Sequence, residues 1–165
     1  MKSLAVAFTG PSDSGKTTLV LKVATILKKE NRLAIIKNDP SDKAIFDVEG
    51  KDSWKFSQTG AEVVITSPTR TTLFSQRQKS LDEIIEMLGD FDFLLVEGLK
   101  NLPLPRIAIF RNKLDESYFD CSDAIAVDES VTLSDYDIPK NIAILNLNNP
   151  EEIVSWILKN AKKVK

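Results

Sequence analysis

The sequence predicts an α/β fold with a mostly parallel sheet and helices on both faces. Short apolar runs of strand length alternate with segments of helical periodicity along the chain. Several of these runs are apolar on both faces, which is typical of strands buried in a parallel sheet. A glycine-bearing loop joins the first apolar run to the first helical segment. Because open parallel sheets bind ligands at the carboxyl ends of their strands, we expect the functional motifs to gather there.

The first half of the chain begins in the order strand, helix, strand. Residues 4–9 form an apolar run, and residues 17–29 place apolar side chains on one side of a helix. The polar stretch 38–50 predicts a loop. Asp52 or Ser53 is expected to cap the short helix that follows. The other strands predicted in this half are 32–37, 62–66 and 71–75.

The second half contains two helices with clear start signals. Residues 80–83 read Ser-Leu-Asp-Glu, a capping box, and Gly89 is placed to end the helix that this box begins. Asn149 and Pro150 precede two acids and open the last helix. No repeat, low-complexity tract or linker divides the chain, so residues 1–165 are predicted to form a single nucleotide-binding domain. The strands predicted in this half are 91–96, 106–110, 124–127 and 142–145.

The composition limits the chemistry that is available. The chain has 165 residues, one cysteine, no histidine and a formal net charge of −2. A single thiol forms neither an internal disulfide nor a cysteine-based zinc site, which favours a reducing compartment. The lack of histidine excludes serine-histidine triads and histidine metal ligands. The net charge does not indicate a nucleic-acid binder, and no apolar stretch approaches the roughly 20 residues of a membrane span, so we expect a cytoplasmic protein.

Residues 10–17 match the phosphate-binding P-loop pattern GxxxxGK[ST] in full. The motif lies between a two-faced apolar run and an amphipathic helix, which is the context that it requires. Glycines permit the backbone angles that turn the loop amides inward as an anion site. We expect Lys16 to reach the β- and γ-phosphates, Thr17 to bind Mg²⁺ and Thr18 to contact the α-phosphate. A P-loop NTPase fold is therefore predicted, with the nucleotide bound by Gly10, Pro11, Ser12, Asp13, Ser14, Gly15, Lys16, Thr17 and Thr18.

Two carboxylates at strand ends are candidates for the chemistry beside this loop. Glu97 ends the apolar run 91–96, where it would hold Mg²⁺ or its water shell, and Gly98 would allow close approach to the γ-phosphate. Asp39 closes the second predicted strand and is expected to contact Mg²⁺ or to position water. The predicted catalytic residues are Lys16, Glu97 and Asp39, and the predicted metal ligands are Thr17 and Glu97.

A second motif is a candidate for recognising the nucleotide base. Residues 112–115 read Asn-Lys-Leu-Asp, and an NKxD motif reads guanine in GTPases. Because four residues with one free position are common in polar loops, the sequence leaves open whether this segment reads a base.

Several segments together resemble the molybdopterin-guanine dinucleotide biosynthesis protein B (MobB) family. Residues 50–54 (GKDSW) and 59–61 (TGA) look like two of its motifs. Residues 96–100 (VEGLK) and the basic-ended strand 106–111 (RIAIFR) are similar to two more. With the P-loop, the likeness spans nearly the whole chain.

The resemblance implies a P-loop protein that binds GTP with Mg²⁺ and hydrolyses it weakly to GDP and phosphate. It also implies a homodimer that acts as an accessory or adapter beside the guanylyltransferase that joins GMP to molybdopterin. Whether molybdopterin itself binds is left open. The family usually carries a histidine-rich stretch where this chain has Lys37-Asn38-Asp39-Pro40, so histidine-dependent contacts are not expected here.

Two other classes of protein use the same phosphate site. A small-molecule kinase would take ATP and would need an acceptor pocket and a lid, for which segment 67–70 and the basic residues near Arg106 are candidates. A binding module without turnover would use Trp54, Phe56 and Phe74 as a partner surface, although core packing is the simpler interpretation of these aromatics. No activating arginine stands out, so slow turnover is expected. The basic candidates for that role are Arg70, Lys100, Arg106 and Arg111.

Overall fold

A computed structural model describes residues 2–165 and divides them into two compact units. The first unit comprises the described residues up to Asn38 together with Leu88–Lys165, and the second comprises Asp39–Met87. Each unit is described by itself. The single nucleotide-binding domain predicted from the sequence stays a prediction.

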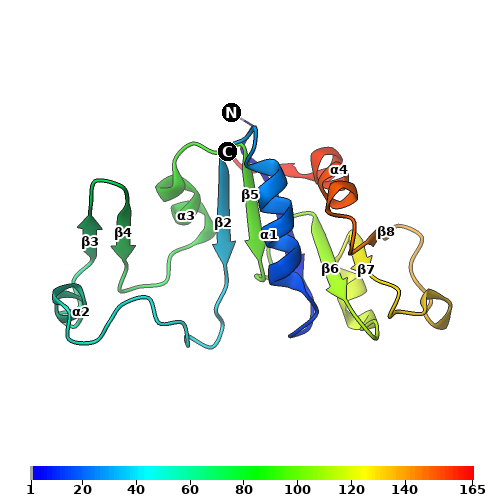
Figure 1. Ribbon diagram of the computed structural model, residues 1–165, viewed down its shortest axis with the longest axis horizontal. Coiled ribbons are helices and arrows are strands. Elements are labelled where there is room, and N and C mark those ends of the chain that lie inside the picture. The colour runs from blue at the N-terminus through cyan, green and yellow to red at the C-terminus, as the bar shows by residue number, and fades with distance from the viewer. Residues whose placement is uncertain (1) are drawn as a thin grey trace. The chain divides into compact units, whose positions relative to one another are not determined.

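The first unit is built on a mostly parallel sheet with strand order β2-β5-β1-β6-β7-β8. Figure 1 shows this sheet with α1 in front of it. The first strand, β1, lies between β5 and β6 and is parallel to both. A short ninth strand pairs antiparallel with the beginning of β1. The strands are β1 Leu4–Thr9, β2 Leu33–Lys37, β5 Phe93–Glu97, β6 Arg106–Phe110, β7 Ala124–Val127, β8 Ala143–Asn146 and β9 Lys162–Lys163.

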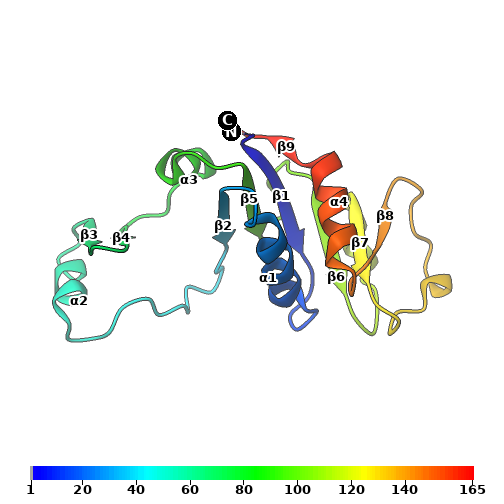
Figure 2. The same cartoon turned by 45° about the horizontal axis from the view of Figure 1, so that its top comes forward.

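Helices α1 (Lys16–Leu27) and α4 (Pro150–Asn160) cover one face of this sheet. Figure 2 shows the two helices on the same side of the strands. Alternate side chains of the strands point to this face, because successive residues of a strand point to opposite sides. Their shared core includes Phe8 and Ile109 from the strands, Val23 from α1 and Ile153 and Ile157 from α4, all at most 1% exposed.

The opposite face over β6 and β7 has a second core. It gathers the other alternate residues of the two strands, among them Phe110 and Ile125, with Leu114 and Tyr118. Tyr118 belongs to the 3-10 helix Glu116–Cys121, and its ring and that of Phe110 pack in a T-shaped arrangement at a centroid distance of 5.4 Å. The sequence indicated neither this helix nor the second 3-10 turn at Leu133–Asp135, because both are too short to show a period.

The second unit has its own two-stranded antiparallel sheet. The strands predicted at 62–66 and 71–75 are confirmed, and they form this separate hairpin. Only Ser67–Arg70 joins them, whereas a parallel crossover needs a dozen residues or more. The first helix of the unit begins after Lys51 without a side-chain cap, so neither Asp52 nor Ser53 caps it. The elements are α2 Asp52–Ser57, β3 Val63–Thr66, β4 Thr71–Phe74 and α3 Leu81–Leu88, whose last residue belongs to the first unit.

Many apolar side chains of the second unit are exposed. Phe56 is 60% exposed, and Trp54 and Phe74 are only partly buried, so interpreting these aromatics as core residues is wrong. A hairpin and a six-residue helix are too small to enclose large rings. The other exposed apolar residues of this unit are Ile45, Phe46, Val48, Val64, Ile65, Leu73 and Met87.

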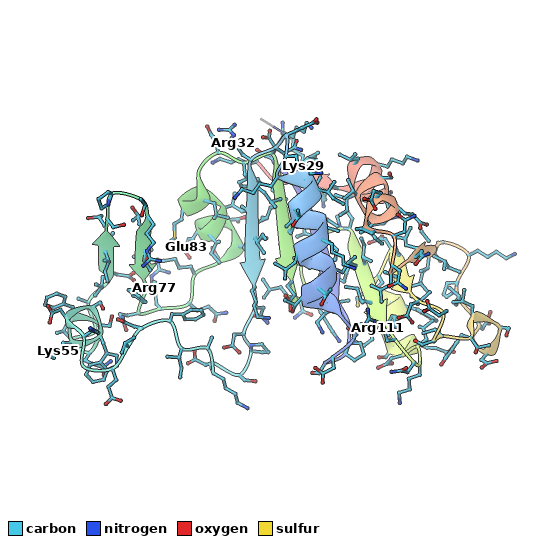
Figure 3. All side chains as sticks on the ribbon, in the orientation of Figure 1. Lys29, Arg32, Lys55, Arg77, Glu83 and Arg111 are labelled. Atoms are coloured by element: carbon cyan, nitrogen blue, oxygen red, sulfur yellow. The ribbon has the colours of Figure 1, made fainter. Side chains whose placement is uncertain are left out.

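The helix starts predicted from the capping box at 80–83 and from Asn149 are confirmed. The Glu83 amide donates to Ser80 Oγ, and the Ser80 amide donates to Glu83 Oε2 at 2.8 Å. Figure 3 shows Arg77 and Glu83 reaching toward each other. The hydrogen bond from Arg77, with that from the Ser80 amide, lowers the pKa of Glu83 to about 2. Asn149 caps α4 by accepting from the Glu152 amide.

Within residues 2–165 no helix combines the length and the apolar character that crossing a membrane requires.

Candidate functional site

The polar residues of the candidate site lie at one edge of the parallel sheet in the first unit. Since β1, β2, β5, β6 and β7 are parallel, their carboxyl ends meet there. The residues that these ends deliver are Gly10 after β1, Lys37 in β2, Glu97 in β5, Arg111 after β6 and Asp128 after β7.

Two glycines give the loop between β1 and α1 its shape. Gly10 has φ +143°, and a Cβ there would collide with the carbonyl oxygen of Ile109 in the neighbouring strand. Gly15 has φ +91° and is the N-cap of α1. Asp13 also adopts a positive φ, of 59°. A side chain at Gly10 would force the loop away from β6, whereas one at Gly15 would meet the Arg111 side chain and would be strained by the positive φ.

Lys16 is folded back onto this loop. Its ammonium group donates to the carbonyl oxygens of Gly10 at 2.9 Å and Pro11 at 2.5 Å. Burial lowers the pKa of Lys16 from its ordinary value; the positive charges of Lys37 and Lys100 act in the same direction, and Glu97 and Asp13 oppose them. The cation is therefore held inside the loop, where an anion would compensate its desolvation.

The hydroxyl groups of the loop differ in exposure. Ser14 is 5% exposed, and its hydroxyl meets no hydrogen-bond partner among residues 2–165. Thr17 and Thr18, in the first turn of α1, are exposed. An orphaned donor inside the loop and free hydroxyls at the helix start are groups that a phosphate and a hydrated cation would satisfy.

Glu97 reaches the edge beside this loop, as the sequence predicted. In register it lies between Phe8 of β1 and Lys37 of β2. Its carboxylate forms an ion pair with Lys37 at 3.0 Å, and its side chain is 12% exposed. Gly98 follows with φ +93°, and its amide donates to the Phe8 carbonyl. Glu97 thus faces a lysine that the sequence analysis had not connected with it.

Asp39 begins the second unit, and its carboxylate organises the loop that follows. It accepts hydrogen bonds from the amides of Ser41, Lys43 and Ala44 at 3.3, 2.9 and 2.7 Å. Such a pattern explains an aspartate at this position by local structure. The role of Asp39 toward Mg²⁺ or water stays a prediction.

Arg106 has a structural role that the sequence did not reveal. It is 1% exposed, and its guanidinium donates to the carbonyl oxygens of Gly98, Leu99 and Leu102 at 2.9, 2.9 and 3.1 Å. Burial lowers the pKa of Arg106, whereas Cys121 and Asp123 act to raise it. Its donors hold the loop that follows β5, so they are already engaged by backbone carbonyls.

Arg111, in contrast, lies directly against the P-loop. Its Cζ is 3.3 Å from the point where a Cβ on Gly15 would stand, and its Nε forms a 3.2 Å ion pair with Asp128. Figure 3 labels Arg111 near the start of α1. A basic residue directly after a strand that neighbours the P-loop strand is the sequence signal for this placement, although the strand order was needed to interpret it.

The Asn-Lys-Leu-Asp segment has a local structural explanation. Asp115 is the N-cap of the 3-10 helix and accepts from the amide and the hydroxyl of Ser117. These hydrogen bonds, the hydroxyl's first, lower the pKa of Asp115. Asn112 adopts φ +66°, and its backbone N–H donates to the Ser130 hydroxyl. Base reading by this segment stays a prediction.

Among the described residues no group of three or more histidine, cysteine, aspartate or glutamate side chains is arranged to hold a metal ion. A cation at this edge would therefore need oxygen ligands from a bound phosphate besides those of the protein. Mg²⁺ in nucleotide sites is bound in that way.

Comparison with known proteins identifies the family. Residues 5–129 match the family model described as "Molybdopterin guanine dinucleotide synthesis protein B". A curated relative from Methanocaldococcus jannaschii, named for a molybdopterin-guanine dinucleotide biosynthesis adapter protein, is 30% identical over 133 residues. That match covers 77% of this chain and 53% of the relative, so this chain spans about half the relative's length.

Two further comparisons cover nearly the whole chain. The adapter protein of the same description from Haemophilus influenzae is 27% identical over 92% of this chain and 86% of its own length. The crystal structure of Bacillus subtilis MobB matches with a TM-score of 0.76 and 22% identity, covering 98% of this chain and 99% of that one. The predicted P-loop NTPase fold, with its mostly parallel sheet, is confirmed. The chain therefore belongs to the molybdopterin guanine dinucleotide synthesis protein B family, MobB, which takes part in the biosynthesis of molybdopterin guanine dinucleotide.

Proposed function

We propose that this chain binds GTP with Mg²⁺ through residues 10–18 and acts as an accessory GTPase or adapter in molybdopterin guanine dinucleotide biosynthesis. The observation that carries the proposal is the conformation of the loop. Gly10, with positive φ, brings the loop close to β6, Gly15 is the N-cap of α1, and Lys16 lies within hydrogen-bonding distance of the loop carbonyls. The loop amides at the start of α1 form the anion site, and the lysine moves from the carbonyls to the phosphates when nucleotide binds.

The neighbouring residues support a hydrated cation. The exposed hydroxyl of Thr17 and the carboxylate of Glu97 supply two oxygen ligands, and the phosphates and water supply the others. Glu97 has to leave Lys37 to take part.

Slow hydrolysis follows from what the basic residues do. Arg106 is committed to three backbone carbonyls, and Arg111 is paired with Asp128. Neither guanidinium is free to stabilise charge that develops on the γ-phosphate, and an arginine in that role accelerates hydrolysis by orders of magnitude. The protein therefore keeps GTP bound for long periods and hydrolyses it only slowly.

An adapter needs a partner surface, and the second unit offers one. Its exposed apolar side chains, among them Ile45, Phe46 and Phe56, supply apolar surface on which a partner could pack. We propose that a second copy of this chain and the guanylyltransferase are the partners in the cytoplasm. The names of the two relatives, which describe adapter proteins, support this role.

Titration calorimetry with GTP and ATP in the presence of Mg²⁺ tests the proposal. Lys16→Ala is expected to abolish measurable GTP binding, and Lys22→Ala, which removes an exposed lysine from the same helix, is the matched control. Unchanged GTP affinity in Lys16→Ala would refute the site. A clear preference for ATP would favour the small-molecule kinase instead. Guanylylation by the candidate guanylyltransferase, measured with and without this chain, tests the adapter role.

A further inference from the structure

Two adjoining cavities lie wholly within the second unit. The larger has a volume of about 560 Å³ and the smaller about 300 Å³. Both are lined by Phe46, Asp47, Thr72 and Phe74, so these residues stand at the junction of the two spaces. Neither cavity includes a residue of the P-loop. The pair is therefore a second candidate site, separate from the phosphate site in the residues that form it.

The carboxylate at this junction is half satisfied. Asp47 Oδ1 accepts from the Val48 amide at 2.8 Å and from Ser53 Oγ at 2.9 Å, which fixes the orientation of the side chain. Oδ2 is buried and has no hydrogen-bond partner among residues 2–165. A carboxylate oxygen shielded from water is unfavourable without a donor, so a donor that entered from the adjoining cavities would stabilise it.

The walls of the larger cavity suit a flat ring. Trp54 of α2 and Phe74 of β4 line it together with Phe46, which is 82% exposed. Aromatic side chains offer faces and edges on which a planar heterocycle stacks. Ser57 and Gln76 add polar groups to the same lining. An aromatic enclosure around a fixed acceptor selects a heterocycle with donors on its edge over an aliphatic ligand.

The smaller cavity adds a positive charge. Arg70 lines it from the turn between β3 and β4, and this turn is closed by hydrogen bonds between Ser67 and Arg70. Ser53 and Ser67 supply hydroxyl groups to the same space. A guanidinium beside hydroxyls is suited to an anionic substituent such as a phosphate or a carboxylate.

We infer that this pair of cavities binds the 2-amino-4-oxo edge of a pterin, with the ring in the larger cavity and its anionic substituent toward Arg70. The ring N–H and the 2-amino group of such an edge are two donors side by side, and Asp47 Oδ2 is the acceptor that remains for them, since Oδ1 already accepts from Val48 and Ser53. Guanine presents the same edge. We choose the pterin as the ligand, and this choice rests on the proposed function in molybdopterin guanine dinucleotide biosynthesis.

Pterin fluorescence provides the test, with 6-hydroxymethylpterin titrated against the full chain and its quenching followed. Asp47→Asn keeps an oxygen for Val48 and Ser53 but places an N–H₂ where Oδ2 stood. Binding is expected to weaken roughly 10- to 100-fold, the effect of a lost hydrogen bond to a charged group. Asp42→Asn is the matched control, because Asp42 is an exposed aspartate of the same loop whose φ of 49° asparagine tolerates. Equal pterin affinity of the two variants would overturn the inference.

Three further experiments distinguish a pterin from the other ligands that could fill the cavities. Lumazine, which has a carbonyl in place of the 2-amino group, is expected not to bind. If it binds as tightly as the pterin, recognition of the 2-amino group by Asp47 is refuted. Arg70→Ala is expected to weaken pterin-6-carboxylate and to leave 6-hydroxymethylpterin unchanged; equal losses for both would refute the anion subsite. Guanosine that displaces the pterin at equal concentration would assign the cavities to guanine instead.

The outcome is distinguishable from failure of the proposed function. Lys16→Ala is expected to lose GTP and to keep the pterin, since Lys16 belongs to the first unit. If GTP binds and the pterin does not, the phosphate site stands and the pterin site is refuted. If the pterin binds only after a mutation that dissociates dimers, the cavities are filled by a second copy, and the inference is equally refuted.

Discussion

Replacing Arg106 by methionine is the sharpest test of how the loop after β5 is held. Methionine keeps an apolar stem inside the sheet but removes the donors to Gly98, Leu99 and Leu102. Leu99 adopts φ +49°, a conformation that costs a residue with a side chain roughly 1–2 kcal/mol and that these hydrogen bonds stabilise. We expect the free energy of unfolding to fall by about 3–5 kcal/mol, the loss typical of removing a buried charged donor from its partners.

Urea unfolding followed by circular dichroism measures this change. With a slope of about 2 kcal/mol per molar urea, the midpoint should fall by about 2 M. Arg111→Met is the control, because that side chain is 43% exposed and forms an ion pair with Asp128, so its loss should be below about 1 kcal/mol. A loss below about 1 kcal/mol for Arg106→Met as well would show that water satisfies the loop carbonyls and would refute the reasoning.

Three other predictions concern the loop, the helix cap and the acid beside the loop. Gly10→Ala should destabilise the chain far more than Gly89→Ala, since both have positive φ but only Gly10 abuts a neighbouring backbone; equal melting temperatures would contradict this. Glu83 has a lowered pKa of about 2, so its contribution is complete above the unfolded pKa of about 4.5 and is lost as the pH falls toward 2. Glu83→Gln should therefore flatten the acid dependence of unfolding in that window, and an unchanged slope would count against it. Lys37→Gln releases Glu97 and should lower the Mg²⁺ concentration for half-maximal GTP binding about two- to five-fold; a higher requirement would show that Lys37 serves the phosphates.

Features that depend on neighbouring residues could be predicted from the sequence. The strands at 106–110 and 124–127 and the capping box at 80–83 were placed correctly, because each depends on residues close together in the chain. The loop from Gly10 to Lys16 was predicted in the same way, since two glycines at fixed spacing between a strand and a helix leave the backbone few alternatives. Alternation of strands with helices was enough to predict the parallel sheet.

Contacts between distant parts of the chain could not be predicted from the sequence. Nothing in the sequence pairs Lys37 with Glu97, buries Arg106 under the loop after β5, or leaves one oxygen of Asp47 without a donor. Arg106 and Arg111 look alike in the sequence, yet one is enclosed and the other is exposed, because Arg106 is the first residue of β6 and Arg111 follows its last residue beside the P-loop.

The sequence by itself thus determined the P-loop, the order of its strands and helices along the chain, and the resemblance that the family comparison confirmed. Only the tertiary structure decided which charges meet, which aromatic side chains stay exposed, and that residues 39–87 form their own unit. The physical reason is that backbone preference and hydrophobic period act over a few neighbouring residues. Ion pairs, burial and cavities depend on which strands the folded chain places next to each other.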